Sequence, residues 1–124
     1  MNILSILAVG AGGFLGSIAR YVTVQTLDNK LNSVFPYGTF AVNVLGSLIL
    51  GIVIALMGKQ TSEWKLFLAT GFCGGFTTFS AFALENISII QGKMTGTSVT
   101  YTLLSLLFGF LAVMAGMLIG RVFS

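Results

Sequence analysis

The stretch Tyr37–Met57 reads YGTFAVNVLGSLILGIVIALM and carries no charged side chain. A helix of about 20 apolar residues, rising 1.5 Å per residue, crosses the roughly 30 Å hydrocarbon core of a bilayer. The most polar segment of the chain, GKQTSE at residues 58–63, follows immediately. The stretch therefore predicts one membrane-spanning helix with a sharp end at the membrane surface.

Three further apolar segments of similar length lie before and after this one. Polar residues close each of them: Asp28-Asn29-Lys30 after the first, Gln91-Gly92-Lys93 after the third and Arg121 after the last. The connections are too short to hold an extramembrane domain. We therefore predict an all-α integral membrane protein, a single transmembrane domain over residues 1–124, with four spans at about 3–27, 37–57, 64–90 and 97–119.

The composition excludes most other classes of protein. Only 7% of the residues are charged and 56% are hydrophobic, whereas soluble domains carry about 25% charged residues. The basic residues form no cluster, which argues against a nucleic-acid partner. The chain has no His, a single Cys (Cys73) and three carboxylates, Asp28, Glu63 and Glu85. We therefore expect no catalytic residues and a protein that is not an enzyme.

The six basic residues divide equally between the two sides of the membrane. An even number of spans puts both termini on one side, and Arg20 lies deep enough in the first span to reach the opposite surface. No positive-inside bias results, so the chain can insert in both orientations and form an antiparallel dimer. The alternative is that other signals fix one orientation. The residues on the terminal side are Lys59, Lys65 and Arg121, and those opposite are Arg20, Lys30 and Lys93.

Small residues recur at helical spacing in the first and last spans. Gly12 and Gly16 form a GxxxG pattern, and Ala112, Gly116 and Gly120 repeat every four residues. Such stripes let helix backbones approach closely in lipid. We interpret them as ordinary helix packing. A pore through four helices alone is cramped, so association with a second copy is also expected.

The third span is interrupted. Residues 74–82, GGFTTFSAF, combine two glycines with three hydroxyl side chains in the middle of an apolar segment. A break there frees backbone amides and carbonyls, which are tolerated in a membrane only when buried in protein, facing water or holding an ion. Two interpretations remain open: a kink whose hydroxyls satisfy the backbone, or an ion site.

Phe79 and Phe82 lie three residues apart after this interruption and share one face of a helix. Aromatic pairs at this spacing usually serve packing. The edge of an aromatic ring, however, carries partial positive charge. Two edges facing one path can therefore accompany a small anion without holding it as firmly as a lysine does.

Polar side chains also interrupt the other spans. Thr39 and Asn43 are one turn apart in the second span, and Tyr101 and Ser105 share a face of the fourth. Asn43 either bonds a neighbouring helix or donates to an anion through its amide group. Glu85 is the one carboxylate well inside a span. It is a functional candidate by default, or it caps polar groups in a vestibule.

Three motifs match those of a known family: GGFLGSIARY at residues 12–21, GTFAVNVLG at 38–46 and GFCGGFTTFSAF at 71–82. On these motifs the sequence resembles the small fluoride channels called Fluc or CrcB. The likeness covers nearly the whole chain, although the fourth span has no sharp motif. It implies an antiparallel homodimer in a bacterial inner membrane. Two pores along the subunit interface would export fluoride passively.

The resemblance also implies roles for individual residues. Phe79 and Phe82 would meet fluoride with their ring edges, and Asn43 would face the pore. Arg20 would bias the vestibule toward anions, with Thr39 and Glu85 near it. The other implied residues are Ser80, Tyr101 and Ser105, as hydroxyls along the path, and Gly74 and Thr77, whose backbone carbonyls would hold a structural Na⁺ on the dimer axis. The family usually has a hydroxyl residue where this chain has Ala81, so one polar group is absent.

Two other classes of protein remain as alternatives. A dual-topology multidrug exporter coupled to protons needs a carboxylate deep in its first span, and this first span has none before Asp28. A non-transporting subunit of a membrane complex explains the glycine stripes. It does not explain the hydroxyls and phenylalanines of the third span.

Overall fold

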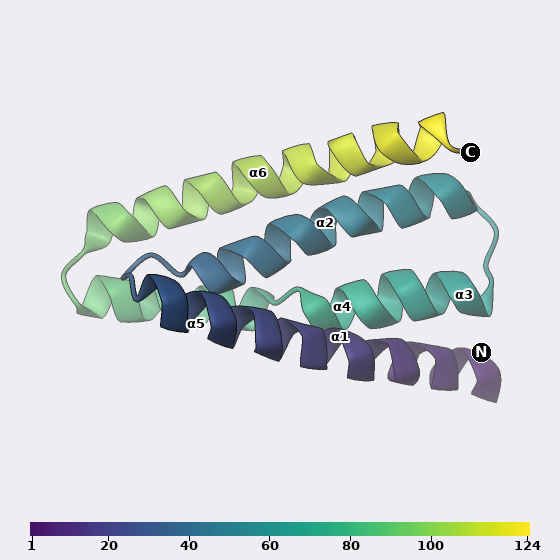
Figure 1. Cartoon of the computed structure of the whole chain (residues 1–124), viewed down its shortest axis with the longest axis horizontal. Helices are drawn as coiled ribbons and strands as arrows, with labels where there is room; N and C mark the ends of the chain where they lie inside the picture. Colours follow the sequence, from purple (N-terminus) through teal and green to yellow (C-terminus); the bar gives the residue numbers. More distant parts are fainter.

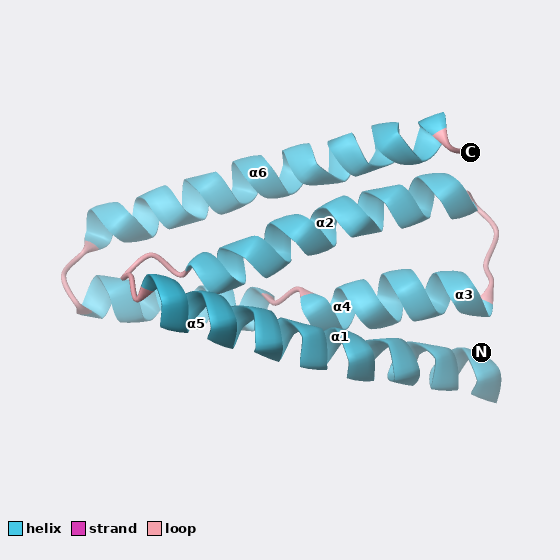
Figure 2. Cartoon of the chain, viewed as in Figure 1, coloured by secondary structure: helices cyan, strands magenta, loops and turns pink.

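The computed structural model describes all 124 residues as helices and short connections (Figures 1 and 2). Four segments are long and apolar enough to cross a membrane: Ile3–Leu31, Tyr37–Met57, Glu63–Gln91 and Thr95–Val122. The predicted all-α fold with four spans and a broken third span is confirmed. The elements are α1 (Ile3–Leu31), α2 (Tyr37–Met57), α3 (Glu63–Lys65), the π-helix η1 (Leu66–Cys73), α4 (Gly74–Phe76), α5 (Phe79–Gln91) and α6 (Thr95–Val122).

The four segments run up and down, so both termini lie at the same end of the molecule (Figure 1). The connection from α2 to α3 is at this end as well. The connections from α1 to α2 and from α5 to α6 lie at the opposite end. This arrangement follows from short connections, which force consecutive spans to be antiparallel.

The first helix runs one turn further than its polar residues suggest. It continues through Asp28 and ends at Leu31, because Asn32 adopts the left-handed conformation (φ 44°) and donates its N–H to the Asp28 carbonyl. Asn is one of the few residues that take this conformation readily at a helix end. The Asp28 side chain also accepts from the N–H of Gly38 (3.3 Å). The end of α1 is thereby tied to the start of α2.

The third span changes its helical form twice. Leu66–Cys73 is π-helical, a rare form that often marks functional sites. Thr77 and Thr78 are extended, with ψ of 160° and 120°. The interruption therefore lies one turn after the two glycines, because Gly74 remains helical and Thr78 starts a new helix. The Thr78 hydroxyl accepts from the N–H of Ala81 (3.1 Å) and caps α5.

Non-sequential spans form the two closest pairings. The first span packs on η1 and α4 of the third, and α2 packs on α6 (Figure 1). A methyl group on Gly12 would collide with the Phe67 carbonyl, and one on Gly16 with the Phe72 carbonyl. In the other pair, Gly51 and Gly116 face each other's backbone. The packing interpretation of the glycine stripes is confirmed.

This close approach gives a prediction for stability. Gly16→Ala forces α1 away from η1, and we expect destabilisation of about 1–3 kcal/mol, as for other overpacked interiors. Gly10→Ala is the matched control, because no atom lies within 4 Å of a methyl group placed there on the same helix. Thermal unfolding of the detergent-solubilised protein measures both. Equal midpoints for the two variants would contradict the close approach of α1 and η1.

Candidate functional site

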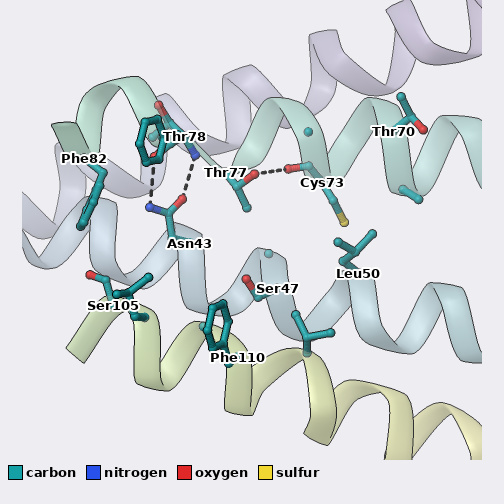
Figure 3. Close-up of a pocket in the computed structure, with 17 residues that line it drawn as sticks. Asn43, Ser47, Leu50, Thr70, Cys73, Thr77, Thr78, Phe82, Ser105 and Phe110 are labelled. Atoms are coloured by element: carbon teal, nitrogen blue, oxygen red, sulfur yellow. Dashed lines mark hydrogen bonds between the residues drawn. The ribbon is translucent and has the colours of Figure 1, made fainter. Parts of the chain in front are cut away.

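A cavity of about 500 Å³ lies where the broken third span faces α2 and α6 (Figure 3). None of the residues that line it is charged. Asn43 and Ser47 of α2, Phe79 and Phe82 of α5 and Ser105 of α6 contribute to its wall. The structure thus brings together the polar residues of three spans with the two phenylalanines that follow the break.

Asn43 holds the interrupted backbone. Its side-chain oxygen accepts from the N–H of Thr78 (2.7 Å), and its amide nitrogen donates to the Thr78 carbonyl (3.1 Å) (Figure 3). One side chain therefore satisfies both backbone groups of an extended residue inside the membrane. An amide nitrogen carries two hydrogens. Because one of them is used here, the second is available to the cavity.

The same contacts free two carbonyls of the break. In a continuous helix the Gly74 carbonyl would accept from the N–H of Thr78, and the Thr77 carbonyl from that of Ala81. The first N–H donates to Asn43 and the second to the Thr78 hydroxyl. Gly74 and Thr77 therefore lose their helical donors.

Phe79 and Phe82 lie side by side, with ring centroids 5.9 Å apart and ring planes tilted by 40°. Phe82 is half-buried and also contacts Tyr101 of α6, with ring centroids 5.1 Å apart. Phe79 is 80% exposed in the single chain. One ring is thus fixed by α6, whereas the other projects from the surface.

Of the predicted hydroxyl residues, only Ser105 lines this cavity. Its hydroxyl is buried and makes no hydrogen bond within the chain. Buried polar atoms are nearly always paired, so this hydroxyl lacks the partner that such an atom usually has. Ser80 is exposed and lines neither cavity described here; its hydroxyl lies 3.4 Å from that of Thr78.

Glu85 joins three spans. It accepts from the hydroxyls of Thr39 on α2 (2.8 Å) and Tyr101 on α6 (3.1 Å). Both hydroxyl residues are almost completely buried. The Tyr101 hydroxyl, which the family resemblance assigns to the pore, thus directs its proton to Glu85. The sequence indicates that each of these side chains needs a partner in the membrane, but not which partner it finds.

A second cavity, of about 350 Å³, lies on the other side of the break. Arg20, Gln25, Thr39 and Glu85 line it, and the Nε atom of Arg20 is buried without a hydrogen-bond partner. Thr78 is the one residue that borders both cavities.

The sequence placed Thr78 in the interrupted motif but did not identify it as a residue of the site. A hydroxyl residue directly before a new helix is the signal that identifies it as a cap.

Comparison with known proteins identifies the family. The family model described as CrcB-like protein, Camphor Resistance (CrcB), matches residues 7–117. The chain belongs to this family. The membership predicted from the three motifs is therefore confirmed.

Curated members of the CrcB family align over almost their whole length. A protein of Gloeothece citriformis is 46% identical over 117 residues, 91% of this chain and 94% of the relative. A protein of Bacteroides fragilis is 41% identical over 124 residues, 96% of this chain and 98% of the relative. A protein of Caulobacter sp. (strain K31) is 45% identical over 121 residues, 94% of this chain and 94% of the relative. Each is named a fluoride-specific ion channel FluC.

Channels are not enzymes, and this agrees with the prediction from composition. Together with the four apolar helices, these bacterial relatives identify a multi-pass bacterial membrane protein.

The contact between Asn43 and Thr78 gives a second prediction. Asn43→Leu leaves the N–H and the carbonyl of Thr78 unpaired inside the membrane, and each unsatisfied group costs about 1–3 kcal/mol. We expect a clearly lower midpoint of thermal unfolding. Ser47→Ala is the control, because Ser47 lies one turn further along α2 and lines the same cavity but does not contact the Thr78 backbone as Asn43 does. Similar midpoints for the two variants would show that the break does not depend on Asn43.

Proposed function

We propose that this chain is a fluoride channel that lets fluoride leave the cell passively through the neutral cavity beside the broken third span. The observation that carries the proposal is the composition of that cavity, which offers weak donors and no charge. The relatives, which are named as fluoride-specific channels, support the choice of ion. The multidrug exporter and the non-transporting subunit are not favoured by these relatives.

Conduction requires that an ion bind well enough to enter and weakly enough to leave. The free N–H of Asn43, the unpaired hydroxyl of Ser105 and the ring edges of Phe79 and Phe82 meet this requirement. Each offers partial positive charge to a small anion. A lysine in the same place would neutralise the anion and hold it.

Arg20 would attract anions to the mouth of this path. Arg20 lines the second cavity, and Thr78 borders both this cavity and the neutral one. A positive charge at a mouth raises the local concentration of anions. Because the charge lies outside the neutral cavity, it does not hold the ion there. Thr39 and Glu85 would shape this vestibule, and Glu85 would also orient the Tyr101 hydroxyl.

An antiparallel homodimer would complete the path. Phe79 projects from the single chain, and Gly74 and Gly109 line the cavity with no atom of the chain within 4 Å of a methyl group placed on either. These features leave room for a second copy. The equal division of basic residues between the two sides permits antiparallel insertion. The proposed partners are therefore fluoride, a second copy of the chain and the lipid bilayer.

A structural Na⁺ on the dimer axis fits the freed carbonyls. Carbonyl oxygens are suitable ligands for a hard cation, and Gly74 and Thr77 have lost their usual backbone donors. One chain offers too few such oxygens for a dehydrated ion, and a two-fold axis doubles their number. When bound, the ion would neutralise these carbonyls and join the two copies.

Efflux from liposomes tests the proposed function. We expect the purified protein to release fluoride rapidly and chloride far more slowly. Phe79→Ile and Phe82→Ile should each slow fluoride release at least about tenfold, since they keep an apolar side chain but remove the electropositive edge. Phe14→Ile is the control, because Phe14 is 67% exposed on α1 and lines neither cavity described here.

Two outcomes would overturn this proposal. Rapid chloride release, or no fluoride release from a folded wild-type preparation, would reject the channel itself. Fluoride release within about twofold of wild type in both ring variants would show that the two rings serve helix packing and not conduction.

Labelling of a C-terminal tag tests the antiparallel dimer. We expect reagents on the two sides of the membrane to label the tag almost equally. Gly74→Val should also weaken the dimer by crowding the break, while the single chain keeps its fold, since no atom of the chain lies within 4 Å of a methyl group placed at Gly74. Cross-linking measures this effect. A tag found on one side only would reject the antiparallel arrangement and the shared cation site.

A further inference from the structure

We propose that Asn86 is a positioning residue that fixes the rotation of α5 and thereby the place of the Phe79 and Phe82 rings in the neutral cavity. Its effect on fluoride conduction rests on the proposed function. Its effect on the position of the rings does not. Asn86 belongs to none of the three family motifs and lines neither cavity described above.

The Asn86 side chain makes three hydrogen bonds, two to α6 and one within α5. Its side-chain oxygen accepts from the hydroxyls of Ser98 (2.6 Å) and Thr102 (3.1 Å), both on α6. Its amide nitrogen donates to the carbonyl of Phe82 (3.0 Å). Ser98 is only 5% exposed. The amide nitrogen thus binds the backbone of the turn that carries Phe82, and the amide oxygen binds the neighbouring helix α6.

The spacing of the residues explains why this contact controls the rings. Phe79, Phe82 and Asn86 stand at positions i, i+3 and i+7 of one helix. At 100° per residue, Asn86 lies within about 20° of Phe79 and about 40° of Phe82 around the helix axis. The side chain that binds α6 and the two rings therefore project from one stripe of α5.

The interruption makes α5 dependent on such a contact. A continuous helix transmits its rotation through its own backbone hydrogen bonds, but Thr77 and Thr78 are extended, so α4 does not set the rotation of α5 in this way. A rotation of about 20° moves a ring about 6 Å from the axis by about 2 Å. That displacement is comparable to the width of a small ion's path. Glu85 supplies another tie on a different face of α5, about 100° from Asn86.

The partners on α6 suit this function. Ser98 and Thr102 are one turn apart and present their hydroxyls to one acceptor. Ser98 is buried and Thr102 is partly buried, so loss of the amide leaves both hydroxyls without the acceptor that they share and Ser98 with little access to water. Tyr101, on the same face of α6, contacts the Phe82 ring directly. The contacts of Asn86 therefore hold the face of α6 against which Phe82 packs.

Fluoride efflux from liposomes containing at most one channel each tests the effect on conduction. The rate constant measures conduction per channel, and the amplitude measures the fraction of vesicles with a folded channel. We expect Asn86→Leu to lower the rate constant about tenfold and Thr102→Val about threefold. Thr102→Ser should conserve the wild-type rate constant, because it keeps the hydroxyl. Thr100→Val is the control, since the Thr100 hydroxyl bonds only its own helix.

A merely structural role for Asn86 predicts a different result. Loss of stability alone would lower the amplitude and leave the rate constant of the surviving channels unchanged. That outcome would overturn the proposal, as would equal rate constants for Thr102→Val and Thr102→Ser.

Fluorine NMR tests the position of the ring without any conduction. 4-Fluorophenylalanine incorporated at position 82 should change its resonance in the Asn86→Leu variant. The same label at position 14 should not, because Phe14 is exposed on α1. An unchanged resonance at position 82 would overturn the proposal. If the wild-type protein releases no fluoride, the proposed function fails, and this measurement still decides whether Asn86 positions the ring.

Discussion

The pairing of Asn43 with Thr78 is the interaction on which the rest of the site depends. The hydrocarbon core of a membrane contains no water to satisfy a broken helix, so every freed backbone group needs a partner within the protein. One amide on α2 supplies both partners for the extended residue. With that requirement met, the third span can stop and start again in the middle of the membrane. A new helix begins there with two phenylalanines in its first turn.

The interruption brings groups that accept together with groups that donate. Thr78 uses its hydroxyl to cap α5 and its N–H to bind Asn43, and this leaves the carbonyls of Gly74 and Thr77 without helical donors. Gly74 and Thr77 line the neutral cavity together with Asn43, Ser105 and the two phenylalanines, so the freed carbonyls and the weak donors border the same space. The same few residues thus supply the carbonyls that the proposed Na⁺ would use and the weak donors that the proposed fluoride path would use.

The sequence predicted the elements better than their contacts. Apolar length decided the four spans, and the glycines and hydroxyls of the third span indicated its interruption. The interruption falls one turn later than the glycines suggest. Gly75, for example, approaches the backbone of Gly13, so it serves packing rather than the break. The partners of Asn43 and Glu85 were not predictable. They depend on how α2, α5 and α6 are rotated against one another, and periodicity within one helix does not contain that information.

The pairing of the spans has a consequence for how the chain assembles. The first span packs on the third, and the second packs on the fourth. Each half of the chain, with two spans, therefore contains one member of each pair and no complete pair. A nascent chain that has inserted only its first two spans exposes two glycine-bearing faces to lipid. The first pair can form only once the third span has inserted, and the second pair needs the last helix, so assembly finishes only when both halves of the chain are in the membrane.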